Sequence, residues 1–225
     1  MINQVLPRSF RGVALKRLTN CARARSGQAP YNAFTLIELI LVVGIIIVLA
    51  GLVLSTVGYA RKKAARARAE TEIAAMSAAC ENYKADNGVY PTSSATNSLN
   101  AQTSFNPTAY QTASQYLYGE LSGDRNFNYV IDQSEQGNRS YFAFKATPTS
   151  ADGTSNSGML SITRSGSTYT VNYILDPFGN SYGYSTVDNP IANPSPTPGY
   201  NPTFDLWSTA GGTTINDVSK WIKNW

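Results

Sequence analysis

The sequence predicts an α+β fold, in which a long N-terminal α-helix packs on a small antiparallel β-sheet with extended loops. Residues 34–58 form an apolar run, and an alanine-rich helical stretch continues it to residue 88. Short runs of strand-forming residues follow, separated by Gly, Ser and Asn clusters. The chain therefore divides into a basic leader, a membrane-spanning helix, the soluble continuation of that helix and a globular β-rich domain (residues 1–33, 34–59, 60–88 and 89–225).

The composition excludes several kinds of active site. The chain has no histidine, which excludes a Ser-His-Asp site and a histidine-based zinc site. Its two cysteines are Cys21 and Cys80, and only Cys80 remains if residues 1–33 are removed. We find no other catalytic set in the sequence, so we expect no enzyme activity and no cofactor apart from a metal considered below.

The basic charge lies at the start of the chain. The formal net charge is +4, but residues 1–33 hold six basic side chains and no acidic one. From Glu70 onward, seven basic residues face 13 acidic ones. The globular part is therefore acidic, and we expect no nucleic-acid partner.

The apolar run is long enough to cross a membrane. Its 25 residues make a helix of about 37 Å, against a hydrocarbon layer of about 30 Å. The apolar core of a signal peptide is usually about 7–15 residues, whereas residues 39–54 alone are 16 without a polar side chain. We expect the segment to stay with the protein as a single span.

The orientation of the span follows from charge and composition together. Six basic residues precede the span and five follow it, in ARKKAARARAE (residues 60–70). The positive-inside rule thus gives a narrow preference for a cytoplasmic N-terminus. The Ser-, Thr-, Asn- and Tyr-rich region after residue 90 is typical of envelope-exposed domains.

Glu38 is the only charged residue in the apolar run. An ionised carboxylate deep in a bilayer costs on the order of 2.5–3.5 kcal/mol, so polar groups there usually have a function. The simpler interpretation is a carboxylate near the end of the span that reaches the lipid headgroups. The residues before Glu38 favour a more specific interpretation.

The segment AFTLIE (residues 33–38) resembles the cleavage and methylation motif of type IV prepilins and of the pseudopilins of type II secretion. The resemblance implies that a prepilin peptidase cuts between Ala33 and Phe34 and methylates the new amine of Phe34. It also implies that Glu38 pairs with the Phe34 amine of a neighbouring subunit, so that docking compensates a buried charge. The chain departs from the family pattern at Ala33, where Gly is strongly preferred, and in its long leader.

Past the membrane we expect the helix to continue to the stop signal Asn87-Gly88. Ile73, Met76, Cys80 and Tyr83 recur at three- and four-residue steps and form one apolar stripe, which predicts the face that packs on the sheet. Glycines recur every seven residues within the span, either by chance or to let helices approach closely in lipid. They are Gly44, Gly51 and Gly58.

The globular domain contains an insertion at residues 93–140, in which SQYLYGEL (residues 114–121) is amphipathic. A loop at residues 189–202 carries five prolines. Strands are predicted at Tyr141–Thr147, Met159–Thr163 and Thr168–Asp176. In the last, Tyr169, Val171, Tyr173 and Leu175 are expected to share one face.

Three segments of this domain resemble the major pseudopilin of type II secretion. They are YKADNGVYPT (residues 83–92), DPFGNSYGY (176–184) and FDLWSTAGG with INDVSKW (204–221). This resemblance implies a pseudopilin fold and a filament of copies of the chain. The implied partners are prepilin peptidase, the inner-membrane assembly platform and minor pseudopilins.

Residues 124–135 have the oxygen spacing of an EF-hand calcium loop. Side-chain oxygens occupy positions 1, 3, 5, 9 and 12, and position 7 can offer a backbone carbonyl. The candidate ligands are Asp124, Asn126, Asn128, Val130, Asp132 and Glu135. Tyr129 stands where the pattern has Gly for the sharp turn, so a solvated Asn/Asp loop remains the alternative.

The C-terminal loop is a weaker calcium candidate. In the major pseudopilin a calcium ion lies there, held partly by aspartates, and this resemblance makes Asn216 and Asp217 candidate ligands. The sequence has Ala210-Gly211-Gly212 where the first of those aspartates would stand.

Three functions are compatible with an anchored β-rich domain. A filament subunit of type II secretion accounts for the leader, the AFTLIE motif and the uninterrupted helix together. A type IV pilin or minor pilin, for adhesion, motility or DNA uptake, is the first alternative. A membrane-anchored envelope binding domain is the second, but it would not need Glu38. We expect a bacterial inner-membrane protein with a periplasmic C-terminal domain that then joins a periplasmic filament.

Overall fold

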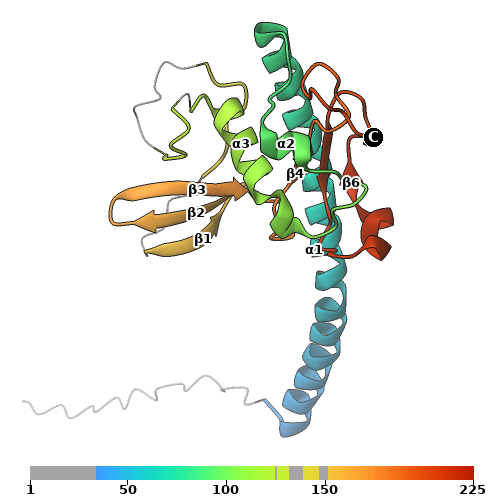
Figure 1. Ribbon diagram of the computed structural model, residues 1–225. Coiled ribbons are helices and arrows are strands. Elements are labelled where there is room, and N and C mark those ends of the chain that lie inside the picture. The colour runs from blue at the N-terminus through green and yellow to red at the C-terminus, as the bar shows by residue number, and fades with distance from the viewer. Residues whose placement is uncertain (1–33, 125, 132–138, 147–151) are drawn as a thin grey trace, which may run out of the picture. The chain divides into compact units, whose positions relative to one another are not determined.

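The computed structural model describes residues 34–124, 126–131, 139–146 and 152–225. The chain divides into two compact units, Met1–Ala50 and Gly51–Trp225. The expected α+β arrangement is confirmed, because a long N-terminal helix precedes small antiparallel sheets (Figure 1). The leader, residues 1–33, lies outside the described residues and stays a prediction.

Among the described residues, the helices other than η2 precede all the strands. The helices are α1 (Leu36–Asn87), α2 (Ser94–Ser98), η1 (Pro107–Tyr110), α3 (Gln111–Ser122) and η2 (Ile215–Lys220). The strands are β1 (Gly153–Ser157), β2 (Leu160–Ser165), β3 (Thr168–Ile174), β4 (Gly183–Ser185), β5 (Asp205–Ser208) and β6 (Ile222–Lys223).

The predicted stop of α1 is confirmed. The helix ends at Asn87, and Gly88 follows in the left-handed region with φ 79°. Glycine adopts this conformation without a Cβ penalty, and the Gly88 N–H donates to the Lys84 carbonyl at 2.7 Å. The amphipathic piece of the insertion is also helical, as the central part of α3.

The strands form two antiparallel sheets among the described residues, ordered β1-β2-β3 and β4-β5-β6. In the first sheet Ser161 pairs with Tyr173 and Ile162 with Val171, so Asn172 is an extra residue in β3. This bulge shifts the alternation of faces, and Ile174 is buried beyond it as well as Val171. The predicted alternation of strand 168–176 therefore holds only up to the bulge.

The prediction of a strand at Tyr141–Thr147 is wrong, since residues 141–146 are irregular. The backbone N–H groups of Tyr141 and Phe142 both donate to the carbonyl of Leu121, at the end of α3. Their hydrogen bonds are thus used on a helix terminus and not on a neighbouring strand. The aromatic pattern reflects packing, because the rings of Phe142 and Phe144 lie 4.6 Å apart.

The second sheet was not predicted as strands. All three residues of β4 and all four of β5 are buried, so neither strand alternates between buried and exposed side chains. Gly183 of β4 pairs with Trp207 of β5, and a Cβ at residue 183 would collide with the Trp207 ring. A buried strand of three or four residues carries no period that could be read from the sequence.

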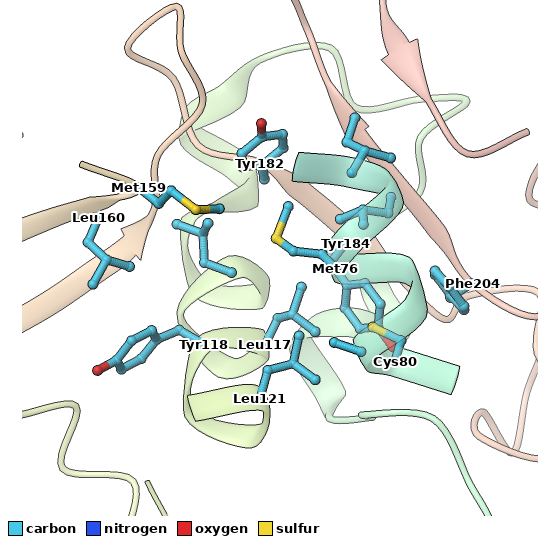
Figure 2. Close-up of a cluster of buried hydrophobic side chains, with 14 of the residues drawn as sticks. Met76, Cys80, Leu117, Tyr118, Leu121, Met159, Leu160, Tyr182, Tyr184 and Phe204 are labelled. Carbon is cyan, nitrogen blue, oxygen red and sulfur yellow. The ribbon is translucent and has the colours of Figure 1, made fainter. Parts of the chain in front are cut away.

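The core of Gly51–Trp225 forms around the second half of α1. Figure 2 shows Met76 and Cys80 of this helix facing Leu117 and Leu121 of α3 and Tyr184 of β4. All five of these side chains have no exposed surface, and burial of Met76 alone contributes roughly 1.5–3 kcal/mol. The predicted apolar stripe is confirmed as the packed face of the helix, with Tyr83 only partly buried, and this face packs on α3 as well as on the sheet.

A buried carboxylate also ties α1 to the domain. Glu72 is 9% exposed, and it accepts hydrogen bonds from the hydroxyl of Tyr182 at 2.7 Å and from Nε of Arg68 at 2.6 Å. A buried charge is tolerated when it is paired and hydrogen-bonded in this way.

The proline-rich segment 189–202 contains no helix or strand, as expected for an extended loop. Side-chain amides hold it in place, since Asn189 donates to the Thr203 carbonyl and Asn193 to the Val187 carbonyl. The backbone N–H of Tyr200 donates to Oδ2 of the buried Asp205 at 3.1 Å.

Candidate functional site

Glu38 and Thr35 form a reciprocal cap at the start of α1. The backbone N–H and the hydroxyl of Thr35 both donate to Oε2 of Glu38, each at 3.3 Å. The N–H of Glu38 donates in return to the Thr35 hydroxyl at 3.3 Å. This is a capping box. The sequence Thr35-Leu-Ile-Glu38 contains its pattern, but the interpretation of Glu38 as a docking charge did not predict the cap.

The cap leaves the docking hypothesis open and gives Glu38 a second role. All three distances are longer than the usual 2.9–3.0 Å, so the cap is weak. Phe34 is 78% exposed. Ala33 lies outside the described residues, so the cleavage site stays a prediction.

The first half of α1 is apolar and uncovered. Its large side chains from Leu36 to Leu54 are between 46% and 76% exposed. Among the described residues, α1 is the one helix long and apolar enough to cross a membrane by length and composition. Gly44, Gly51 and Gly58 all lie on α1, and a Cβ at any of them would meet nothing within 4 Å. A helix with this surface needs lipid or other helices around it.

At Tyr129 the predicted calcium loop has the backbone conformation that the pattern requires. Tyr129 adopts φ 57°, the left-handed conformation for which the pattern has Gly. Its N–H donates to Oδ2 of Asp124 at 2.7 Å. The side-chain oxygens of Asn126 and Asn128 each accept a backbone N–H two residues on, at 2.9 and 2.8 Å. The substitution of Gly by Tyr129 therefore does not prevent the turn.

The backbone of Val130 is compatible with its predicted role at position 7. Val130 forms an isolated bridge with Thr170, made by the N–H of Ile131 to Tyr169 and the N–H of Val171 to Tyr129. Neither hydrogen bond uses the Val130 carbonyl. Asp132 and Glu135, the ligands at positions 9 and 12, lie outside the described residues.

The C-terminal loop pairs its aspartate with a lysine. Asp217 accepts from Nζ of Lys220 at 2.9 Å and from the hydroxyl of Thr214 at 2.8 Å. These contacts, the lysine first, lower the pKa of Asp217 to about 2. Asn216 is exposed and lies beside it in η2. The lysine ammonium supplies the positive charge that a metal would bring, so the loop is a poorer metal site than residues 124–135.

The other reactive groups of the domain are enclosed. Cys80 has no exposed surface, and burial raises the pKa of its thiol well above the ordinary value. A thiol in this state is a poor nucleophile. The described residues contain no group of three or more His, Cys, Asp or Glu side chains that could hold a metal ion.

Comparison with known proteins relates the chain to one secretion machine. The family model described as Type II secretion system (T2SS), protein G matches residues 56–157. A Type II secretion system core protein G from Pectobacterium carotovorum subsp. carotovorum is 37% identical over 73 residues, which are 32% of this chain and 47% of that protein. The chain thus spans about half the length of this curated relative. No solved structure matches the chain. The predicted resemblance to this family is confirmed over residues 56–157, whereas the segments 33–38, 176–184 and 204–221 lie outside the matched range.

Proposed function

We propose that this chain, similar to the type II secretion system protein G, is a structural pseudopilin subunit that assembles into a helical filament and drives protein export. The observation that carries the proposal is the uncovered apolar half of α1, joined in one helix to a domain matched by the protein G family model. Such a helix can rest in a bilayer and later pack against copies of itself. The subunit acts by assembly and not by catalysis.

The position of Glu38 favours a filament over a simple anchor. A membrane anchor gains nothing from a carboxylate in its apolar run, whereas a docking helix can use it to recognise the amine of a neighbouring Phe34. An anchored binding domain would also have no use for the AFTLIE junction. The runner-up is a type IV pilin or minor pilin, which shares this junction.

The proposed location follows from the span. The chain starts in the bacterial inner membrane with its N-terminus in the cytoplasm and its C-terminal domain in the periplasm. Prepilin peptidase removes residues 1–33. The mature subunit then meets the assembly platform, minor pseudopilins and further copies of itself in a periplasmic filament.

Mass spectrometry of the membrane-extracted protein tests this proposal. The mature chain should begin at N-methylated Phe34, and a strain without prepilin peptidase should retain residues 1–33. Ala33→Gly is the matched variant and should be cut at least as fast. A mature N-terminus elsewhere contradicts the family role. Deleting the gene should stop export of secreted enzymes and leave surface pili intact, while the reverse result would favour the pilin alternative.

We also propose that residues 124–135 bind calcium and stabilise the domain. Three observations support it: the left-handed Tyr129, the hydrogen bond from its N–H to Asp124, and a Val130 carbonyl that the bridge with Thr170 does not use. Calcium would be held by side-chain oxygens of Asp124, Asn126, Asn128, Asp132 and Glu135. As a hard cation it would tighten the loop without taking part in any reaction.

A further inference from the structure

A groove lies where α1 passes the loops after β3 and β5. Its volume is about 860 Å³. One side is a face of the helix, and the other is formed by two turns and the end of η2. The lining residues are Tyr59, Lys62, Lys63 and Arg66 of α1, then Phe178, Ala210, Gly211 and Lys220.

The cationic side chains of α1 that line this groove lie on one face of the helix. Tyr59, Lys62, Lys63 and Arg66 follow one another at steps of three, one and three, so they share one face of α1. In the part of the chain that the structure describes, neither Lys62 nor Lys63 forms an ion pair. Arg66 donates to the Lys220 carbonyl at 2.9 Å, and this hydrogen bond joins the two sides of the groove. Arg66 also pairs with Glu70, within α1, at 3.3 Å. The groove therefore holds uncompensated positive charge.

The opposite side is apolar at Phe178 and Ala210, with Lys220 at the end of η2 beside them. Phe178 lies in a turn whose N–H groups donate to Oδ1 of the buried Asp176, from Phe178 at 2.9 Å and from Asn180 at 2.8 Å. Oδ2 of Asp176 accepts from the hydroxyl of Ser208 at 2.6 Å, and that hydroxyl oxygen accepts the N–H of Ala210 at 3.1 Å. One carboxylate thus holds Phe178 and Ala210 in a common wall. The groove combines a cationic rim with an apolar floor.

The sequence position of the groove matches the depth of lipid headgroups. The apolar run ends at Gly58, and Lys62 follows after about 6 Å of helix and Arg66 after about 12 Å. Headgroups occupy roughly 5–7 Å on each side of the hydrocarbon layer, and lysine side chains reach back toward it along their apolar stems. Tyr59 stands at the boundary, where aromatic residues with one polar end are enriched.

We infer that this groove binds an anionic phospholipid, with the headgroup phosphate on Lys62, Lys63 and Arg66 and the adjoining glycerol and upper acyl carbons against Phe178. The inference rests on the proposed membrane-anchored subunit. A purely acidic partner, such as a second copy, would use the cations but not the apolar wall. An amphipathic ligand uses both.

Native mass spectrometry of the full chain in detergent measures the lipid that stays bound. The probes are phosphatidylglycerol, which is anionic, and phosphatidylcholine, which has no net charge. We expect selective retention of phosphatidylglycerol. Lys62→Gln or Lys63→Gln should each weaken it about fivefold, the loss expected for one basic contact at a lipid surface.

Arg61→Gln is the matched control. Arg61 is exposed on the same turn of α1, carries the same charge and does not line the groove. It should change retention less than about twofold. Phe178→Ala should weaken retention without changing the charge, which a purely electrostatic attraction would not show. Melting temperatures of the variants check that each is folded.

Four results overturn the inference. Equal retention of the two lipids removes headgroup selectivity, and an equal loss in Arg61→Gln and Lys63→Gln makes the attraction diffuse. Displacement by millimolar inorganic phosphate assigns the groove to a free anion. If Lys63→Gln instead abolishes self-association of lipid-free protein while lipid retention persists, the occupant is a second copy. Correct processing at Phe34 with no selective retention rejects the groove alone, whereas selective retention without processing rejects the pseudopilin role alone.

Discussion

The two halves of α1 have opposite surroundings within one helix. From Leu36 to Leu54 the large side chains are exposed, whereas Ile73, Met76 and Cys80 are buried against α3 and the strands. The first half is apolar on all sides, and the second is apolar on one stripe only. The stripe of the second half has its partner in the same chain, and the surface of the first half must find one in lipid or in other chains.

The acidic residues Glu38 and Asp205 show the same contrast between an exposed and a buried environment. Glu38 lies on the uncovered half and has only Thr35 as a partner among the described residues. Asp205 is 1% exposed and belongs to a completed core. Substitutions in the first half should therefore alter assembly, and substitutions in the second should alter stability.

The largest effect is expected at Glu38. Glu38→Ala should insert and be cleaved normally, but its incorporation into filaments beside wild-type subunits should fall about tenfold or more, because the charge proposed to pair with the Phe34 amine of a neighbouring subunit is lost. Filament yield and export of secreted protein measure it. Glu38→Gln separates the two roles of the residue, since glutamine keeps the cap and removes the charge. Normal filaments from the Gln variant would leave Glu38 as a cap alone.

Met76→Ala should have the largest effect on stability. Removing a fully buried methionine should lower the free energy of unfolding by about 2–5 kcal/mol. Thermal melting of the full chain in detergent measures this. Val53→Ala on the exposed half is the control and should leave the melting temperature of the domain unchanged. Equal losses from both would mean that the first half of α1 also has a partner within the chain.

Calcium should stabilise the globular half only. The fragment of residues 62–225 should melt at a higher temperature in millimolar calcium than in chelator. Its free energy of unfolding should rise by about 2.7 kcal/mol if calcium is a hundredfold above its Kd. Glu135→Gln should remove most of this gain, because position 12 normally supplies two oxygens. Asp217→Asn should matter less. An unchanged melting temperature in chelator rejects both loops, and a loss only in Asp217→Asn moves the site to the C-terminal loop.

The smallest effect concerns pH and Asp205. Burial raises the pKa of this carboxyl from 3.8 to about 6, although the N–H of Tyr200 works against the shift. The folded protein then holds the proton more tightly than the unfolded chain, so Asp205 makes stability fall as pH rises from about 4 to 6, by about 1–3 kcal/mol. Asp205→Asn should therefore reduce the change in melting temperature between pH 4 and 6, measured by thermal unfolding at a series of pH values.

Asp217→Asn is the control for this pH dependence. The pKa of Asp217 is lowered to about 2, so its contribution is present above pH 4 and disappears as pH falls toward 2. Its replacement should leave the change between pH 4 and 6 as it was. If Asp205→Asn also leaves that change intact, the buried carboxyl is not its source.

Periodic features could be predicted from the sequence, and tertiary hydrogen bonding could not. The stripe of α1, its end at Asn87 and the helix at residues 114–121 follow from local rules of spacing and capping. The aromatic run after Ser140 satisfies the same rules for a strand, yet its N–H groups bond the end of α3. No local pattern encodes which carbonyl a distant N–H will meet.

The candidate site divides in the same way. AFTLIE, the apolar run and the oxygen spacing of residues 124–135 are readable because each depends on neighbours in the chain. Asp217 and Lys220 are also close in the sequence. Only the side-chain geometry of the folded chain shows that the lysine takes the place beside Asp217 that a metal would need. The groove between Lys62 and Phe178 brings together residues more than a hundred positions apart, so no sequence pattern predicted it.

By itself the sequence determined that this protein carries an apolar helix long enough to cross a membrane and a domain without histidine, and it predicted a prepilin-type junction at residues 33–38. These are properties of composition and spacing, which folding does not alter. Only the tertiary structure decided that β4 and β5 are buried strands and that Asp176 holds the turn at Phe178 beside Ala210. The reason is that each of these depends on free energies of burial and pairing between segments far apart in the chain, which exist only once the chain has folded.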